Sequence, residues 1–243
     1  MNQEFSNVYD DKARSEAYDS LEFPGTYYLA YRDLPAMIRK HVSGRRAIDF
    51  GCGAGRSTRF LRSHGFDVVG VDISEHMLTL ARRRDPDRDY RLIPNDDLSG
   101  FAAGSFDLVL AVLTFDNIPT FEKKLLIFQS LKRLLNQNGC IVIVVSSPEI
   151  YVHEWTSFST KDFPGNWTAG SGEKVFVVML DVDDRRPVED ILCSADDYRE
   201  MFRRAGLVPA DTHKPIGNSS EPYRWVSETT IAPWTIYVLK AKE

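Results

Sequence analysis

Residues 47–56 read Ala-Ile-Asp-Phe-Gly-Cys-Gly-Ala-Gly-Arg, and residues 68–72 read Val-Val-Gly-Val-Asp. Each stretch begins with an apolar run of the kind that forms a buried strand of a parallel sheet. The glycines lack a Cβ, so the chain can bend sharply there and a ligand can approach its backbone. Asp72 follows about 20 residues later, where nucleotide-binding α/β proteins place an acid that accepts hydrogen bonds from ribose. The pattern therefore predicts a strand–loop–helix–strand unit that binds a nucleotide.

The spacing of the glycines separates two classes of ligand. A dinucleotide fingerprint that starts at Gly51 requires its third glycine at position 56, where this chain has Arg56. Glycines at 51, 53 and 55 instead resemble motif I of the class I S-adenosylmethionine-dependent methyltransferases. The resemblance is to the small-molecule branch of that family, of the methyltransferase 11 type, and it extends over residues 45–240.

Apolar runs alternate with amphipathic helices along most of the chain. Strands are expected at 46–50, 67–71, 90–93, 106–113, 140–145, 207–208 and 234–239. Helices are expected at 8–43, at 56–64, from the cap Ser74 to 83, from the cap Thr120 to 135, and between Ser194 and Gly206. Together with the resemblance, this order predicts an α/β fold: a Rossmann-like, seven-stranded, mostly parallel sheet with helices on both faces.

The chain is expected to be a single methyltransferase domain, 1–243, with four parts. These are an N-terminal helical cap at 1–44, a cofactor-binding core at 45–147, a variable acceptor-side insertion at 148–194, and the C-terminal part of the sheet at 195–243.

The insertion follows the fifth strand and is rich in aromatic residues. We expect one strand in it, at 174–181, and a solvated turn at 181–190, where charges of both signs mix. Its aromatic side chains could stack on a planar acceptor or form a small satellite core.

Composition argues against several other classes of protein. The formal net charge is −5, from 30 basic and 35 acidic residues. The composition therefore lacks the excess of positive charge that is typical of proteins that bind nucleic acid or an anionic membrane. Cys52, Cys140 and Cys193 lack the paired spacing of a zinc site, so no metal is expected. The N-terminus does not resemble a signal peptide, and no apolar run is long enough to cross a bilayer. We expect a cytoplasmic monomer or homodimer that binds a small-molecule acceptor, with no nucleic acid or membrane partner.

The resemblance implies how S-adenosylmethionine would be held. Asp49 matches the acid of motif I, which helps to hold the amino group of the ligand, and Asp72 matches the acid that accepts from both ribose hydroxyls. Asp96 is the first choice for the group near the adenine amine, with Asn95 and Asp97 as alternatives. The full implied set of cofactor contacts is Asp49, Gly51, Cys52, Gly53, Gly55, Asp72, Ile73, Met77, Asn95, Asp96, Val112 and Leu113.

No catalytic base stands out. Many relatives carry a histidine after the fourth strand, where this chain has Phe-Asp-Asn at 115–117. In-line positioning beside an electrophilic sulfonium can supply much of the rate without a base. The candidates for a base are Tyr9, Asp116, His153 and Glu154.

The resulting prediction is an enzyme that transfers a methyl group to an O, N or C atom of a small molecule and releases S-adenosylhomocysteine. An RNA- or protein-directed methyltransferase and a non-catalytic S-adenosylmethionine-binding module remain as alternatives.

Overall fold

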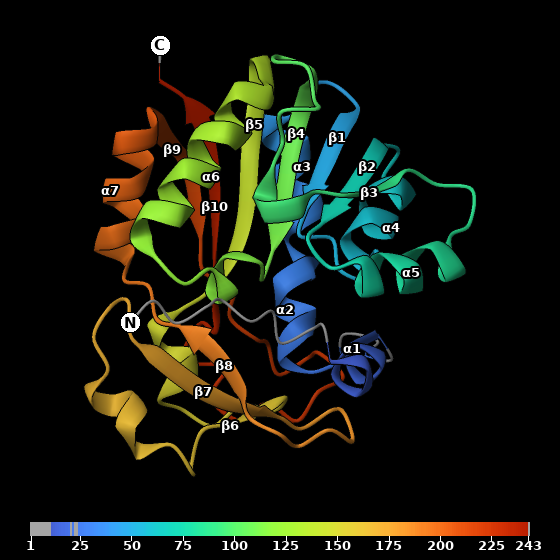
Figure 1. The fold of residues 1–243 in the computed structure, drawn as a ribbon. Helices are drawn as coiled ribbons and strands as arrows, with labels where there is room; N and C mark the ends of the chain where they lie inside the picture. The colour runs from blue at the N-terminus through green and yellow to red at the C-terminus, as the bar shows by residue number, and fades with distance from the viewer. Residues whose placement is uncertain (1–10, 20, 22–23, 243) are drawn as a thin grey trace, which may run out of the picture.

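Seven strands form the central sheet of the computed structural model, which describes residues 11–19, 21 and 24–242. The strand order is β3-β2-β1-β4-β5-β10-β9 (Figure 1). β10 is antiparallel to both β5 and β9, and the other neighbouring strands are parallel. The predicted fold class is therefore confirmed. The strands are β1 Arg46–Phe50, β2 Asp67–Asp72, β3 Tyr90–Leu92, β4 Phe106–Val112, β5 Leu135–Ser146, β9 Leu207–His213 and β10 Trp234–Ala241.

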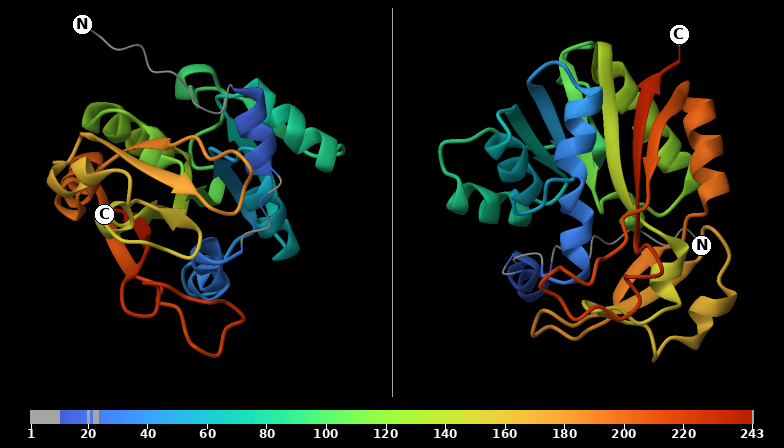
Figure 2. Two further views of the ribbon diagram at one scale, coloured as in Figure 1. Left: turned by 90° about the horizontal axis from the view of Figure 1, so that it is seen from below. Right: turned by 180° about the vertical axis from the view of Figure 1, so that it is seen from behind.

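Helices cover both faces of this sheet (Figures 1 and 2). Successive residues of a strand point to opposite faces, so Leu108 of β4 joins one hydrophobic core and Val109 joins the other. Side chains of α2, α3 and α4 close the first core, and side chains of α6 and α7 close the second. The helices are α1 Lys12–Asp19, α2 Thr26–Arg32, α3 Leu34–His41, α4 Arg56–Ser63, α5 Glu75–Arg84, α6 Phe121–Leu134 and α7 Ala195–Ala205.

Three predicted N-caps are present. The hydroxyls of Ser74, Thr120 and Ser194 each accept a hydrogen bond from the backbone N–H three residues later, which satisfies one free donor of the helix that follows. Gly206 ends α7 with a φ of 70°.

β5 begins earlier than the sequence suggested. The strand was expected at 140–145, but α6 ends at Leu134 and the next residue is already extended, with φ −68° and ψ 135°. The pairing of β4 with β5 shifts register after Phe106, and Asn138-Gly139 falls within this irregular part of β5. A glycine there avoids a Cβ 2.9 Å from the carbonyl oxygen of Phe106.

The insertion forms a second, three-stranded sheet across the carboxyl ends of the parallel strands, with the order β6-β7-β8 (Figure 1). Its strands are β6 Phe158–Ser159, β7 Lys174–Met179 and β8 Val188–Ile191. The prediction of a solvated turn over 181–190 is wrong for its last residues, which form β8. Val188 and Asp190 alternate onto the inner face of this strand and are buried, whereas the charged residues 183–186 stay at the surface or partly exposed.

A buried cluster joins three segments that are far apart in the sequence. The Glu228 carboxylate, in the loop between β9 and β10, accepts hydrogen bonds from the Thr26 hydroxyl and the Thr156 N–H. The Thr26 hydroxyl in turn accepts from the Ser157 N–H, and the Thr26 N–H donates to the Ser157 hydroxyl, both at 3.0 Å. The start of α2, the insertion and the C-terminal loop are thus held together (the Glu228 cluster).

Within the described ranges no helix is long and apolar enough to cross a membrane. In the same part of the chain no three His, Cys, Asp or Glu side chains gather in a way that could hold a metal ion.

Candidate functional site

The loop between β1 and α4 bends through left-handed glycines. Gly51, Gly53 and Gly55 have φ angles of 69°, 52° and 79°. A Cβ on Gly51 would lie 2.2 Å from Cγ2 of Thr114, whereas a Cβ on Gly53 would meet only the Met77 Cε atom, at 3.1 Å. Gly51 is therefore needed for packing inside the protein, and Gly53 keeps the space in front of the loop open.

Gly55 and Cys52 occupy the inner side of this loop. A Cβ on Gly55 would lie 2.4 Å from the Tyr90 hydroxyl. Cys52 packs in a small buried cluster that includes Tyr90, and burial raises the pKa of its thiol well above the usual value. Neither residue lines the main pocket in front of the loop. Cys52 lines a smaller space beside it, together with Tyr31 and Arg56.

Asp72 connects the glycine loop to the start of α5. One carboxylate oxygen accepts the Gly53 N–H at 2.8 Å, and the other accepts the Ser74 N–H at 2.9 Å. Burial raises the pKa of Asp72, although these two backbone donors oppose the shift. Both donors hold the side chain in one orientation at the end of β2, where its remaining lone pairs can accept further hydrogen bonds.

Asp49 lies beneath the loop and is fully buried. One of its oxygens accepts from the hydroxyls of Ser57 and Thr58, at 2.7 and 2.6 Å. Its other oxygen, Oδ1, is buried and has no hydrogen-bond partner. Burial raises the pKa of this carboxyl to about 6. The buried acceptor is costly on its own and is available to a donor that a ligand or a water brings.

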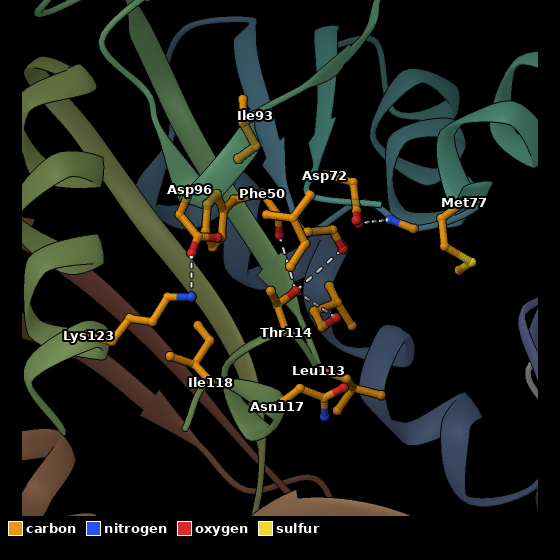
Figure 3. A pocket seen from close by; sticks show the side chains of 14 residues that line it. Phe50, Asp72, Met77, Ile93, Asp96, Leu113, Thr114, Asn117, Ile118 and Lys123 are labelled. Carbon is orange, nitrogen blue, oxygen red and sulfur yellow. Dashed lines mark hydrogen bonds and ion pairs between the residues drawn. The ribbon is translucent and has the colours of Figure 1, made fainter. Parts of the chain in front are cut away.

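The turn after β3 places Asp96, rather than its neighbours, at the pocket. Asp96 forms an ion pair with Lys123 at 3.0 Å, and Figure 3 shows the two side chains pointing toward one another. Asn95 and Asp97 are exposed and do not line the pocket, and the Asp97 carboxylate accepts the Ser99 N–H instead.

The chain is also left-handed where β4 ends. Leu113 has a φ of 57°, and its N–H donates to the carbonyl oxygen of Val144 at 2.8 Å. Asn95 and Asp96 have φ angles of 56° and 60°, and no other non-glycine residue in the described part of the chain has a positive φ. Such a conformation costs about 1–3 kcal/mol and tends to occur at functional sites. All three residues lie where strands of the sheet end.

These elements enclose one cavity, which we call the glycine-loop pocket (Figure 3). Apolar side chains form most of its wall, and Asp72 and Asp96 supply its carboxylates. Its lining is Phe50, Gly51, Gly53, Asp72, Ile73, Met77, Ile93, Asp96, Val112, Leu113, Thr114, Asn117, Ile118 and Lys123.

A second cavity, the carboxylate pocket, lies between the end of the main sheet and the three-stranded sheet. It shares Leu113 and Asn117 with the glycine-loop pocket, so the two cavities are adjacent. Its lining is Tyr27, Leu113, Asp116, Asn117, Ser146, Ile150, Tyr151, Phe158, Val177, Met179, Val188, Asp190 and Trp234.

Two buried aspartates, Asp116 and Asp190, line this pocket. Asp116, in the 3-10 turn Phe115–Asn117, accepts from the backbone N–H and the hydroxyl of Ser146. Asp190, on β8, accepts from the Asn117 amide at 2.7 Å and from the Tyr151 hydroxyl at 3.1 Å. Burial, and then the charge of Asp116, raise the pKa of Asp190 to about 7, and burial also raises the pKa of Asp116.

The other predicted bases lie elsewhere. His153 does not line either pocket; its ring packs edge-on against Trp155 and Trp167, with centroids 6.2 and 6.0 Å away. The Glu154 carboxylate accepts three hydrogen bonds from Ser159 and Thr160, which lower its pKa against the opposing effect of burial, so it stabilises the turn next to β6. Tyr9 lies outside the described residues.

Sequence reasoning missed Asp190 and Lys123. A signal for Asp190 was present, because Val188 and Asp190 share one face of a segment that could pair with the predicted strand at 174–181. Lys123 lacks such a signal, since its partner Asp96 comes from another element of the fold.

Comparisons with known proteins agree on the class of fold. Residues 48–143 match the model of a family described as "Methyltransferase domain". A ubiquinone biosynthesis O-methyltransferase from Bordetella avium is 32% identical over 82 residues, which are 32% of this chain and 34% of that protein. A malonyl-[acyl-carrier protein] O-methyltransferase from Legionella pneumophila is 30% identical over 148 residues, or 59% of this chain and 49% of that protein.

The chain thus spans between a third and a half of the length of these two curated relatives. The crystal structure of an S-adenosylmethionine-dependent methyltransferase from Mesorhizobium loti superposes with a TM-score of 0.62 and 20% identity. That superposition covers 86% of this chain and 97% of the other, and it shows a shared fold.

Proposed function

We propose that the chain is a class I S-adenosylmethionine-dependent methyltransferase that methylates a small molecule held in the carboxylate pocket, and the match of residues 48–143 to a methyltransferase-domain model supports this. The observation that carries this proposal is the contact between the two cavities at Leu113 and Asn117. A methyl donor in the glycine-loop pocket would lie next to an acceptor in the carboxylate pocket, as transfer between them requires.

The residues of the glycine-loop pocket fit the nucleoside part of S-adenosylmethionine. Asp72 is held by two backbone donors and would accept hydrogen bonds from the ribose hydroxyls. Asp96 would accept from the adenine amine, and the apolar side chains of Ile73 and Met77 would flank the ring. When bound, S-adenosylmethionine supplies a methyl group that its sulfonium makes electrophilic.

The smaller space beside the glycine loop fits the amino-acid end of the same ligand. It shares Gly51 and Gly53 with the glycine-loop pocket, and the Arg56 and Asp19 side chains add a positive and a negative group to its wall. A guanidinium pairs well with a carboxylate, and a carboxylate pairs with an ammonium. The unpartnered Oδ1 of Asp49 would accept a hydrogen bond from that end of the ligand, directly or through a water.

The acceptor side combines the N-terminal helices with the insertion. Tyr27 of α2 lines the carboxylate pocket together with residues of the insertion and with Trp234 of β10. These side chains are buried, which supports a small acceptor rather than a folded macromolecule. The curated relative named for ubiquinone biosynthesis also supports a small acceptor.

Binding of S-adenosylhomocysteine by calorimetry tests the donor side. The variant Asp72→Ala removes an ionised acceptor, and a hydrogen bond to such a group contributes about 1.5–3 kcal/mol. We therefore expect at least a tenfold loss of affinity. Asp67→Ala is the matched control, because Asp67 is exposed at the opposite end of β2. An unfolding curve of each variant separates lost binding from lost stability.

Each result has a defined meaning. Unchanged affinity in Asp72→Ala would contradict the role of this residue, and no binding by the unsubstituted protein would contradict the proposed function. The second assay follows release of S-adenosylhomocysteine with fractionated metabolites as acceptors. Binding without turnover in any fraction would favour a non-catalytic binding module.

A further inference from the structure

The carboxylate pocket carries negative charge without a positive group in its wall. Asp116 and Asp190 are only 5% and 8% exposed, and no Lys, Arg or His is among the described residues that line the cavity. Lys124 of α6 does not line it, although its charge opposes the rise in pKa of both carboxyls. Buried carboxylates are costly unless a positive group balances them. A cationic ligand would supply that balance.

The donors around the two aspartates favour their ionised forms. Ser146 donates twice to Asp116, while Asn117 and Tyr151 each donate once to Asp190. These contacts fix the orientation of the carboxylates, and they leave lone pairs for a further donor. The pocket is thus arranged to receive a hydrogen-bond donor that carries positive charge.

The rest of the wall is aromatic and apolar. The Tyr27 and Phe158 rings lie with centroids 4.8 Å apart, and the Trp234 ring lies 6.2 Å from Tyr27 and 5.9 Å from Phe158. Aromatic faces attract cations as well as apolar groups. Such a wall fits an organic cation with an apolar or aromatic body better than it fits a hydrated inorganic ion.

We propose that the acceptor is a primary or secondary amine, bound as its ammonium ion between Asp116 and Asp190 and methylated on nitrogen. This inference rests on the proposed function and adds the chemical class of its acceptor. It also gives the two aspartates separate tasks: one carboxylate pairs with the ammonium while the other takes its proton.

The proton and the methyl group balance in this scheme. The ammonium gives one proton to the Asp190 carboxylate, which frees a lone pair on nitrogen. That lone pair forms the new N–C bond as the C–S bond breaks, and S-adenosylhomocysteine leaves as a neutral thioether. The nitrogen becomes positive, next to the Asp116 carboxylate, which stabilises the charge that appears there. Asp190 then returns its proton to water.

Binding of matched ligands to the S-adenosylhomocysteine-saturated protein tests the inference. Phenethylamine and 2-phenylethanol differ in the polar group and share the aromatic body. We expect the amine to bind at least tenfold more tightly than the alcohol at about pH 8. In Asp190→Asn we expect at least a tenfold loss for the amine and little change for the alcohol. Glu189→Gln is the control, because Glu189 is the next residue on β8 and pairs with Lys174 on the outer face.

The pH dependence of amine binding provides a second readout. An alkylammonium has a pKa of about 10 and stays charged from pH 6 to 9. Affinity should therefore rise with pH as Asp190, with its pKa at about 7, becomes ionised. The charged and titratable groups around Asp190 are Asp116, Tyr151 and Lys124.

Two outcomes would overturn the inference. The first is equal affinity for the amine and the alcohol. The second is a protein that binds S-adenosylhomocysteine but shows no saturable binding of either phenethylamine or its N-methyl derivative. Failure to bind S-adenosylhomocysteine would instead overturn the proposed function. If Asp190→Asn does not fold, the comparison of the amine with the alcohol on the unsubstituted protein still tests the inference.

Discussion

Alanine at Gly51 and alanine at Gly53 should have different consequences, although the two residues lie in one loop. Both have a left-handed φ, which costs an L-residue about 1–2 kcal/mol. At Gly51 the new Cβ would also lie 2.2 Å from Cγ2 and 2.5 Å from Oγ1 of Thr114. At Gly53 its nearest neighbour is the end of the flexible Met77 side chain, at 3.1 Å.

The clash of the new Cβ at position 51 with Thr114 should make Gly51→Ala less stable than Gly53→Ala. Thr114 would have to move, which breaks the hydrogen bond that its hydroxyl donates to the carbonyl oxygen of Phe50 at 3.1 Å. That bond contributes about 1 kcal/mol, and overpacking adds about 1–3 kcal/mol. We expect Gly51→Ala to lower the free energy of unfolding by about 3–6 kcal/mol, and Gly53→Ala by only about 1–2 kcal/mol.

Urea denaturation of the two variants measures this difference, and a double-mutant cycle isolates its cause. Thr114→Ala removes the two atoms that clash most, Cγ2 and Oγ1, and leaves only its Cβ at 2.9 Å, so Gly51→Ala should cost at least about 1 kcal/mol less in that background. Gly53→Ala should instead weaken S-adenosylhomocysteine binding at least tenfold, because its Cβ would enter the open space in front of the loop. Equal destabilisation by the two alanines, or additivity of Gly51→Ala with Thr114→Ala, would refute this reasoning.

Three further substitutions test other parts of the structure. The pKa of Asp49 rises from 3.8 to about 6 on folding, so the native state holds a proton that the unfolded chain loses. The free energy of unfolding should therefore fall by about 3 kcal/mol between about pH 4 and pH 7. Asp49→Asn should lack this part of the pH dependence of stability. Thr120→Ala removes the N-cap of α6 and should cost about 1 kcal/mol in urea denaturation, whereas an unchanged midpoint would contradict the role of the cap. Tyr151→Phe removes a donor to Asp190 that lowers the pKa of that carboxyl, so the pH midpoint of amine binding should move upward, and a downward move would count against the assignment.

The sequence predicted the candidate site best where its residues lie close together along the chain. The apolar run before Gly51, the glycines and the acid at Asp72 belong to one strand–loop–helix–strand unit, so their spacing alone places them at the end of the sheet. Asp96 could be placed only to within a residue, because a left-handed turn at Asn95 decides which side chain of the turn faces the pocket.

The carboxylate pocket was much harder to predict, because the residues that pair in it are distant in sequence. Asn117, in the turn after β4, donates a hydrogen bond to Asp190 of β8, and no local pattern links that turn with a strand of the insertion. Leu113 is another example, since a leucine gives no sign of a left-handed conformation that only its surroundings impose. The glycine spacing indicated room for a ligand at all three positions. In the structure, however, the space next to Gly51 and Gly55 is filled by the side chains of Thr114 and Tyr90.

The Glu228 cluster has a consequence for attempts to engineer this protein. Because Thr26, Thr156 and Glu228 depend on one another, the three segments that surround the carboxylate pocket form one discontinuous unit. A chimera that exchanges only the insertion with a relative would have to reproduce the contacts that residues 156 and 157 make with the Glu228 carboxylate and with Thr26. Recombination should therefore move the α2 segment, the insertion and the loop before β10 as one block, and leave the donor-binding core as the recipient scaffold.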